Sequence, residues 1–308
     1  MALVVLLPVP VRLALATPAR AVPQGPGWCL EPKIDGWRVC VHTAAGIVQS
    51  RNGNDLAHRF PEIVAAGHVL GDVVIDGEMV ALRDGRLDFT ALALFPPARA
   101  SVGVVIYYAC FDLLATDTTD RRREPYRTRR ARLADLLAGA GPLLQQVPMT
   151  TDRQVAARWL DPAMAEVGIE GCVAKPADAP YRAGRASGWL KIRQKVLMDC
   201  LVVGITGPAQ RPESLVLAHP KPANRPRLIG VTLPLPRPVA EQLGVLLTPL
   251  DEPRQPLPGV LLGLPGHPAS DYQPVQPALI VEVEADPLIE YGRLRHRVRL
   301  HRVRSEPS

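Results

Sequence analysis

The sequence contains very little lysine. Of its 36 Lys and Arg residues only 5 are Lys and 31 are Arg, so positive charge is nearly always carried by a guanidinium. An arginine keeps its proton and cannot attack an electrophile, whereas a lysine can once burial or neighbouring cations lower its pKa. Lysines in so arginine-rich a chain therefore suggest that lysine chemistry is needed. They are Lys33, Lys175, Lys191, Lys195 and Lys221.

Cysteine is also sparse, and its placement argues against two kinds of site. The 5 cysteines are widely spread, their number is odd, and no two form a Cys-x-x-Cys pair. This pattern argues against a disulfide framework or a zinc site, and favours a reducing cytoplasm. The apolar start of the chain is too short to span a bilayer and is broken by Pro8 and Pro10, which argues against a signal peptide.

The overall composition is that of a globular protein. A chain of 308 residues with 47% hydrophobic and 21% charged residues is expected to fold as two domains. Its net charge of +6 and its pI of about 9.3 suit a polyanionic partner.

The first two thirds of the chain mix strand and helix signals. Residues 1–27 are rich in proline and are expected to form a wrapping arm. Apolar periodicity and turn residues predict helices at 59–66, 125–138 and 153–167. The same signals predict strands at 28–33, 37–43, 46–50, 73–82, 104–113, 171–175 and 188–193.

The character of the chain changes near residues 195–199. Short strands separated by proline-rich connections are expected at 200–205, 214–218, 228–233, 278–284 and 295–303, with one helix at 238–248. Five strands with one helix fit an OB-fold barrel. We therefore expect two domains, 1–197 and 198–308.

Six short motifs follow one another in order. Residues 33–38 read Lys-Ile-Asp-Gly-Trp-Arg, which is the Lys-x-Asp-Gly-x-Arg pattern of nucleotidyltransferases that form a covalent lysyl–nucleotide. The other five lie at 50–56, 76–78, 111–114, 170–175 and 185–193. From Glu31 to Arg193 this series resembles the ATP-dependent DNA ligases, most closely their small bacterial two-domain form. The resemblance implies an α+β fold: a nucleotidyltransferase domain of antiparallel sheets with flanking helices, followed by the OB-fold domain.

The chemistry of such a site explains its residue types. An amine attacks the α-phosphate of ATP while pyrophosphate leaves in line, and catalysis is mostly positioning and charge neutralisation. Lys33 is the expected nucleophile. Lys175, Lys191 and Arg193 would surround the phosphates with positive charge and help lower the pKa of Lys33. Alternation along a strand places Lys191 and Arg193 on one face.

The remaining site residues follow from oxygen chemistry or from the resemblance. Glu78 and Glu170 offer hard oxygen ligands for Mg²⁺, with Mn²⁺ as an alternative. The resemblance implies that Glu31 reads the adenine amino group and that Phe111 stacks on the base. It also implies contacts to ribose, phosphate or the nicked strand from Arg38, Arg51 and Arg185.

Several of these residues also have plain structural interpretations. Phe111 could be an ordinary core residue, and residues 76–77 a hairpin turn. Residues 170–171 could be the end of a helix closed by glycine. The arginines at positions 121–130 could form either a DNA-backbone patch or a solvated face.

The chain departs from the family at two places. The expected Arg-x-Asp-Lys element near the C-terminus is replaced by residues 302–306, which keep Arg302 and Arg304 but lack Asp-Lys. Arg193 stands where a second lysine is usual, which keeps the charge but changes its geometry. Only 32 residues precede Lys33, which on the family pattern disfavours NAD as the cofactor.

The expected function is sealing of nicks in duplex DNA with ATP, by a monomer with no membrane association. Its expected partners are nicked or broken double-stranded DNA and a DNA-end-binding or repair protein. Two alternatives stay open: an RNA ligase or capping-type nucleotidyltransferase, and a weakly active module that binds DNA breaks.

Overall fold

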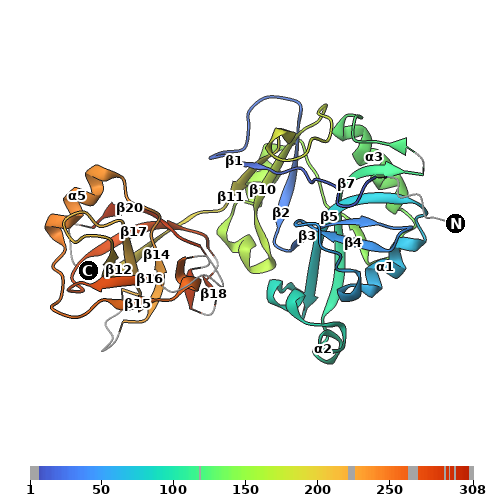
Figure 1. The fold of residues 1–308 in the computed structure, drawn as a ribbon. Coiled ribbons are helices and arrows are strands. Elements are labelled where there is room, and N and C mark those ends of the chain that lie inside the picture. Colours follow the sequence, from blue (N-terminus) through green and yellow to red (C-terminus); the bar gives the residue numbers. More distant parts are fainter. Residues whose placement is uncertain are drawn as a thin grey trace. The chain divides into compact units, whose positions relative to one another are not determined.

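The chain forms two compact units, Met1–Arg193 and Gln194–Ser308 (Figure 1). The computed structural model describes residues 7–117, 119–220, 226–262, 270–287, 289–290, 292–294 and 296–304. The division falls slightly before the expected 197/198 boundary, because β12 (Val196–Thr206) is one continuous strand of the second unit. Within the described residues no helix is both long and apolar enough to cross a bilayer.

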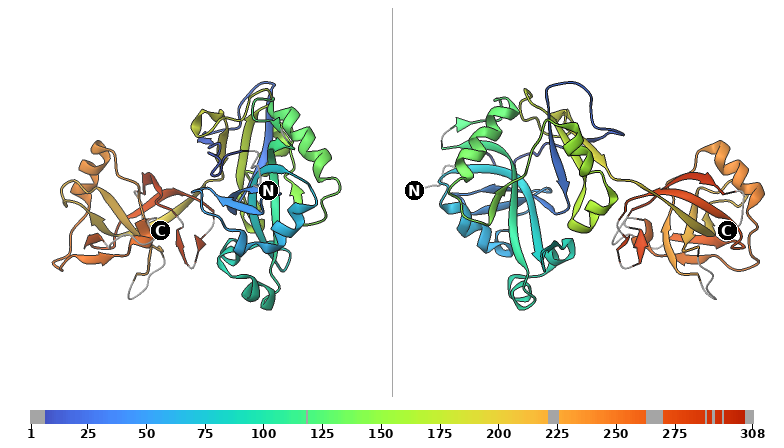
Figure 2. Two further views of the ribbon diagram at one scale, coloured as in Figure 1. Left: turned by 45° about the vertical axis from the view of Figure 1, so that its right-hand side comes forward. Right: turned by 180° about the vertical axis from the view of Figure 1, so that it is seen from behind.

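A seven-stranded sheet forms the body of the first unit. Its main path runs β4-β3-β5-β7-β8, with β6 on β5 and β9 on β7. The strands are β3 (Trp37–His42), β4 (Ile47–Ser50), β5 (Val73–Arg83), β6 (Arg86–Leu87), β7 (Val105–Thr116), β8 (Thr119–Asp120) and β9 (Leu144–Gln146). Helices α1 (Pro61–His68) and α3 (Tyr126–Leu137) lie against this sheet (Figure 2). Apolar side chains of the sheet and of both helices form one core cluster.

A second sheet of the first unit has four strands in the order β1-β11-β10-β2. These are β1 (Thr17–Pro18), β2 (Trp28–Ile34), β10 (Ile169–Pro176) and β11 (Leu190–Arg193). The expected arm supplies β1, which lies parallel to β11. Upstream, the Gln49 side chain exchanges two hydrogen bonds with the backbone of Val11, at 2.6 and 2.8 Å. The wrapping arm is therefore confirmed over its described residues.

The predicted helix at 153–167 is wrong in its continuity. Helix α4 (Arg153–Arg158) is short, and a separate 3-10 helix follows over Pro162–Val167. The cause is local: the Asp161 side chain accepts a hydrogen bond from Ala163 N–H, and Pro162 occupies the first helical position, so a new helix begins there. Among the described residues of this unit, the remaining α-helix is α2 (Pro96–Ser101), and further 3-10 helices cover Ala57–Arg59, Phe89–Ala93 and Arg185–Ser187.

The second unit is built on β12, which pairs with β13, β16 and β17. Helix α5 (Arg237–Leu246) packs on the core of this sheet. The other strands are β13 (Ser214–Ala218), β14 (Leu228–Val231), β15 (Gln255–Leu257), β16 (Ser270–Pro274), β17 (Ile280–Ala285), β18 (Ile289–Glu290), β19 (Arg293–Leu294) and β20 (Arg299–Val303). This OB-like sheet after a mixed sheet-and-helix unit confirms the predicted α+β class.

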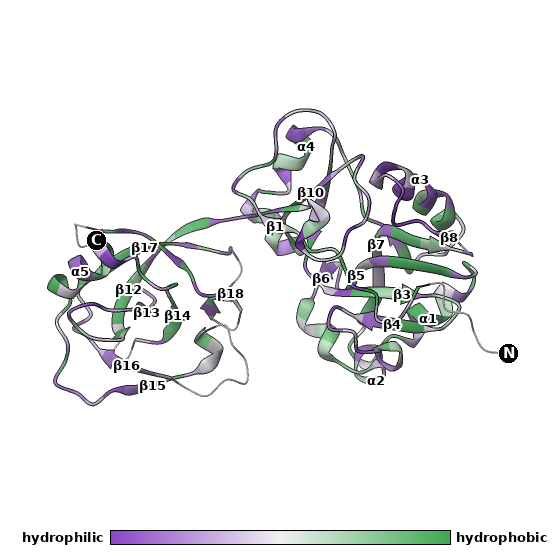
Figure 3. Cartoon of the chain, turned by 45° about the horizontal axis from the view of Figure 1, so that its top comes forward, coloured by the Kyte–Doolittle hydropathy of each residue, from purple (hydrophilic) through white to green (hydrophobic). Residues whose placement is uncertain are grey.

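Helix α3 carries many hydrophilic residues (Figure 3), yet part of it is buried. Arg129 is fully buried and donates to both Asp112 oxygens, at 2.7 and 2.8 Å. Arg130 is also buried. Neither expected interpretation of the arginines at 121–130, a DNA patch or a solvated face, therefore holds for these two.

The first prediction tests the buried pair between Arg129 and Asp112. Arg129→Gln should lower the free energy of unfolding of the first unit by about 3–5 kcal/mol, because it leaves a buried carboxylate without its partner. The matched control is Arg127→Gln, because Arg127 pairs with Asp178 and both side chains are equally exposed. This substitution should lower the free energy of unfolding by less than about 1 kcal/mol.

Tryptophan fluorescence during urea unfolding makes this measurement specific. All four tryptophans (Trp28, Trp37, Trp159 and Trp189) lie in the first unit. Equal shifts for the two variants would contradict the assignment of Arg129 as a buried structural charge.

Candidate active site

Strand pairing gathers the lysine motif and the last motif on one sheet face. Val173 on β10 is aligned with Glu31 on β2 and with Lys191 on β11. Side chains two residues apart on a strand share a face, so Lys33 lies on the face of Glu31, and Arg193 on that of Lys191. The alternation expected for Lys191 and Arg193 follows from this register.

The glycine of the lysine motif is required by close packing. The chain leaves the four-stranded sheet at the end of β2, turns at Gly36, and enters the seven-stranded sheet as β3. A Cβ atom on Gly36 would lie 2.3 Å from the backbone oxygen of Met79 on β5. Only glycine allows this approach. The turn therefore fixes Lys33 and Arg38 on opposite sides of the junction between the sheets.

Lys33 is paired with one of the two expected metal ligands. Its Nζ donates to a carboxylate oxygen of Glu170, and Arg193 Nη2 lies 3.6 Å from the same oxygen. The interpretation of residues 170–171 as a helix end is wrong, because both lie inside β10. Gly171 sits at a register shift of that strand, where a Cβ would meet the Ile192 carbonyl at 2.1 Å.

A group of cations surrounds this pair. Burial lowers the pKa of Lys191, and repulsion from Arg193, Lys33, Arg51 and Arg185 lowers it further. Arg51 follows β4, and Arg185 opens the 3-10 helix Arg185–Ser187, so four separate segments contribute. We call these five residues the cation group. Mutual repulsion of this kind suits a site that binds a polyphosphate.

Glu78 is the second expected metal ligand. Burial raises its pKa to about 7, while Arg38 and Lys33 act in the opposite direction. Glu78 and Glu170 thus both lie near Lys33. The described residues contain no cluster of three or more His, Cys, Asp or Glu side chains suited to a metal. Two carboxylates still fit Mg²⁺, which commonly binds one or two carboxylates together with substrate phosphates and water.

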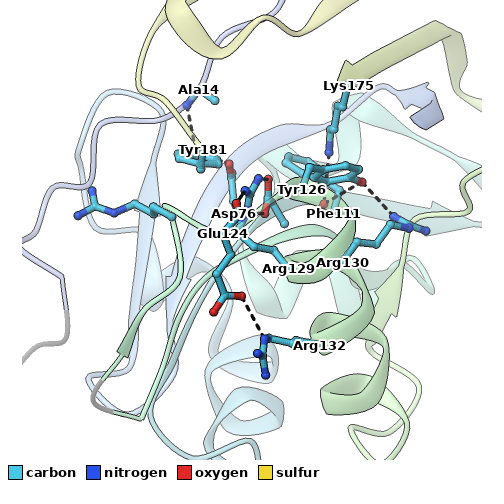
Figure 4. A network of polar contacts seen from close by, with 12 residues as sticks. Ala14, Asp76, Phe111, Glu124, Tyr126, Arg129, Arg130, Arg132, Lys175 and Tyr181 are labelled. Carbon is cyan, nitrogen blue, oxygen red and sulfur yellow. Dashed lines mark hydrogen bonds and ion pairs between the residues drawn. The ribbon is translucent and has the colours of Figure 1, made fainter. Parts of the chain in front are cut away.

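Lys175 lies with Glu31 rather than with the cation group. Its Nζ is 2.6 Å from Glu31 Oε2 and donates to the Phe111 carbonyl at 3.2 Å. The ammonium also lies over the rings of Phe111, Tyr126 and Trp189, at 4.3, 4.7 and 4.3 Å from their centroids. Burial lowers the pKa of Lys175 despite the nearby carboxylates. Figure 4 shows its side chain pointing toward Phe111 and Tyr126.

Phe111 occupies an irregularity in β7. Asp112 pairs with Asp76 and Cys110 with Gly77, so Phe111 is the extra residue of a β-bulge. Phe111 is 8% exposed, and the guanidinium of Arg38 lies 4.5 Å from the centroid of its ring. The ring is thus packed as a core residue, and a base stacking on it would have to share its face with a cation.

Arg38 belongs to a buried network that the motifs did not indicate. It donates to both oxygens of Asp76, at 2.6 and 2.7 Å. Tyr181 also donates to Asp76, at 2.6 Å, and accepts from Ala14 N–H of the arm (Figure 4). The hairpin-turn interpretation of residues 76–77 is wrong, because both lie inside β5. Asp76 instead fixes the orientation of Arg38.

Tyr126 and Arg130 are two further site residues that sequence reasoning missed. Both reach the carboxylate of Glu31 from α3. Their spacing of four residues on a predicted helix was the available signal, since it places them on one face. This signal was missed because the helix is polar overall, so its buried face was not expected.

Comparisons with known proteins identify the family of this chain. Residues 14–193 match the family model described as ATP dependent DNA ligase domain. The chain is 36% identical over 205 residues to DNA ligase C2 of Mycolicibacterium smegmatis, covering 63% of this chain and 57% of that protein. It is 34% identical over 209 residues to DNA ligase C of Mycobacterium tuberculosis, with the same coverage. The chain therefore spans little more than half the length of these relatives.

Solved structures show the same fold over nearly the whole chain. A mycobacterial DNA ligase D complexed with ATP and MES is 25% identical, with a TM-score of 0.51 and coverage of 96% of this chain and 95% of that one. A Lig E DNA ligase, 18% identical, has a TM-score of 0.57 over 96% of this chain and all of its own. These matches confirm the resemblance found in the motifs.

Proposed function

The chain belongs to the ATP-dependent DNA ligase family, and we propose that it seals nicks in duplex DNA with AMP taken from ATP. In the first step the Lys33 nitrogen forms a bond to the α-phosphorus while pyrophosphate leaves. The AMP then passes to a DNA 5′-phosphate, releasing Lys33. The adjacent 3′-hydroxyl finally attacks that phosphate, and AMP leaves.

One observation carries this proposal: Lys33 donates a hydrogen bond to the carboxylate of Glu170 and lies near the other four members of the cation group. Lys33 must lose a proton before its nitrogen can attack, and Glu170 accepts a hydrogen bond from that nitrogen, so it is placed to receive the proton. Lys191, Arg193 and Arg185 supply fixed positive charge to the phosphates, where preorganised charge is most effective. A Mg²⁺ or Mn²⁺ ion held by Glu78 and Glu170 would withdraw further charge from the phosphates.

The nucleotide base belongs at the other end of the same sheet face. Glu31 carries the buried carboxylate suited to the adenine amino group, and Lys175 lies beside it. Phe111 supplies an aromatic ring, and Arg38 lies over that ring. Arg51 and Arg38 are the candidates for ribose or nicked-strand contacts. This arrangement separates base recognition from the phosphate chemistry at Lys33.

The proposed substrate is nicked or broken double-stranded DNA, bound by a monomer, with a DNA-end-binding or repair protein as a further partner. An RNA ligase, a capping-type enzyme or a weakly active break-binding module would use the same lysine differently. Assays with nicked DNA, nicked RNA and GTP separate these alternatives. Turnover on nicked DNA would exclude the break-binding module.

The second prediction concerns Lys33. The wild-type chain should retain label from α-labelled ATP and not from γ-labelled ATP, because pyrophosphate leaves. Lys33→Ala and Lys33→Arg should retain no label, since neither side chain offers a neutral amine. Lys195→Ala is the matched control, because that half-exposed lysine lies in the second unit beside Asp286. Label on either Lys33 variant, read on a denaturing gel, would remove Lys33 as the nucleophile.

The third prediction concerns Glu170. Glu170→Ala should slow self-adenylylation by about 10²–10³, the usual cost of losing one charge contact in a dry phosphate site. EDTA should abolish every step if a divalent cation is required. Glu166→Ala, which removes an exposed carboxylate of the preceding 3-10 helix, should leave the rate unchanged. Ligation by Glu170→Ala within a few-fold of wild type would refute the metal and proton roles of this residue.

The fourth prediction concerns the second unit. Arg302 and Arg304 lie on and just after β20, where Arg302 Nε donates to Glu282 at 2.9 Å and Arg304 Nε lies 3.0 Å from Asp199. These carboxylates orient both guanidinium groups, and the pairing with Arg302 lowers the pKa of Glu282. We propose that both arginines orient the β- and γ-phosphates when the second unit closes over the nucleotide.

The double change Arg302→Ala with Arg304→Ala tests this role. It should slow the ATP step strongly and largely spare sealing of a nick that is already adenylylated. Arg299→Ala, an exposed arginine of the same strand, is the control and should change neither step. Equal loss in both assays would assign Arg302 and Arg304 to DNA binding, and an unchanged ATP step would refute the closing role.

A further inference from the structure

The Glu31 carboxylate is held by three donors of the described chain. Its Oε1 accepts from the Tyr126 hydroxyl and from Arg130 Nη1, the latter at 2.9 Å. Its Oε2 lies 2.6 Å from Lys175 Nζ. Glu31 is only 3% exposed, so an ionised carboxylate here depends on these partners.

We propose that Tyr126 and Arg130 are positioning residues that set the purine specificity of the nucleotide site through Glu31. This inference rests on the proposed function. An ionised carboxylate has about four acceptor positions, two on each oxygen. Tyr126 and Arg130 fill both positions on Oε1, and Lys175 fills one on Oε2. The position left on Oε2 accepts one further N–H, which a 6-amino purine supplies and a 6-oxo purine does not.

The helix makes this orientation rigid. Tyr126 and Arg130 lie four residues apart on α3, so both side chains project from the same face. The other end of the Arg130 guanidinium donates to the Val147 carbonyl, and the Arg130 carbonyl accepts from Gln146 Nε2 at 3.0 Å. Burial raises the pKa of Tyr126 well above its usual value, so its hydroxyl stays a donor. The Glu31 carboxylate therefore has little freedom to rotate.

Loss of Arg130 should change the selectivity of this carboxylate. Without Arg130, Oε1 of Glu31 keeps only the Tyr126 hydroxyl as a donor, so the carboxylate is free to turn about its last bond. Its remaining acceptor position on Oε2 is then no longer held toward the 6-amino group of the purine. Discrimination between purines should therefore fall, over and above any general loss of activity.

The test is a thermodynamic cycle in which Arg130 of the protein and the 6-amino group of the nucleotide are removed separately and together. Formation of the lysyl adduct is measured as kcat/KM with α-labelled ATP, GTP and purine riboside triphosphate, which lacks the 6-amino group. The wild-type chain should prefer ATP over both analogues. In Arg130→Gln this preference should fall by about 10- to 100-fold, the range seen when a residue that orients a functional ligand is removed. A purely structural role would slow all three nucleotides equally, so the two changes would be additive.

Two further variants complete the test. Tyr126→Phe removes one donor to Oε1 while keeping the ring, and should reduce the preference for ATP in the same direction but less. If tryptophan fluorescence shows that Arg130→Gln does not fold, the cycle is measured with Tyr126→Phe alone. Arg132→Gln is the control, because Arg132 lies on the same helix but its exposed side chain binds Glu124 at 3.0 Å. Its nucleotide preference should equal that of the wild type.

The outcomes separate this inference from the proposed function. Removal of the 6-amino group lowers kcat/KM by some factor in the wild type. If it lowers kcat/KM of the folded variants by the same factor, the positioning role is refuted while ligase activity stands. If the wild type forms no lysyl adduct with any nucleotide, the proposed function itself fails. A preference for ATP that falls in the two variants and not in Arg132→Gln supports the role.

Discussion

The first unit depends on the compensation of carboxylate charges that are buried away from water in its two sheets. Asp76, Asp112 and Glu31 are all buried, and a buried carboxylate is tolerated only when cations and hydrogen bonds compensate its lost hydration. Arg38 and Arg129 each meet their carboxylate with two hydrogen bonds. The bidentate geometry of a guanidinium suits this task better than an ammonium does.

The sequence was sufficient for the parts of the fold that local signals determine. Every predicted strand of the first unit exists, and the motif glycine at position 36 marks a real point of close approach. The continuous helix at 153–167 was wrong, although Asp161 and Pro162 carried the signal for a new start. Apolar periodicity alone does not register such an interruption, because it records where apolar residues recur and not where a capping side chain starts a new helix.

The site was less predictable than the fold, because it depends on pairing between segments distant in sequence. The motifs indicated Lys33, Lys191 and Arg193 as neighbours. Alternation on β2 and β11, the two strands that flank β10, places these side chains on one sheet face. They could not indicate that Phe111 is the extra residue of a bulge. Bulges depend on the register of two strands, which a single sequence leaves undetermined.

Lys33 and Lys175 illustrate why lysine was kept at particular positions of an arginine-rich chain. Lys33 is half-buried and bonded to a carboxylate, where a removable proton is useful. Lys175 is almost completely buried among three aromatic rings, where a compact ammonium fits and a planar guanidinium would need more room. The presence of lysine therefore has two physical causes here, reactivity at Lys33 and size at Lys175. Composition alone could suggest the first cause but not the second.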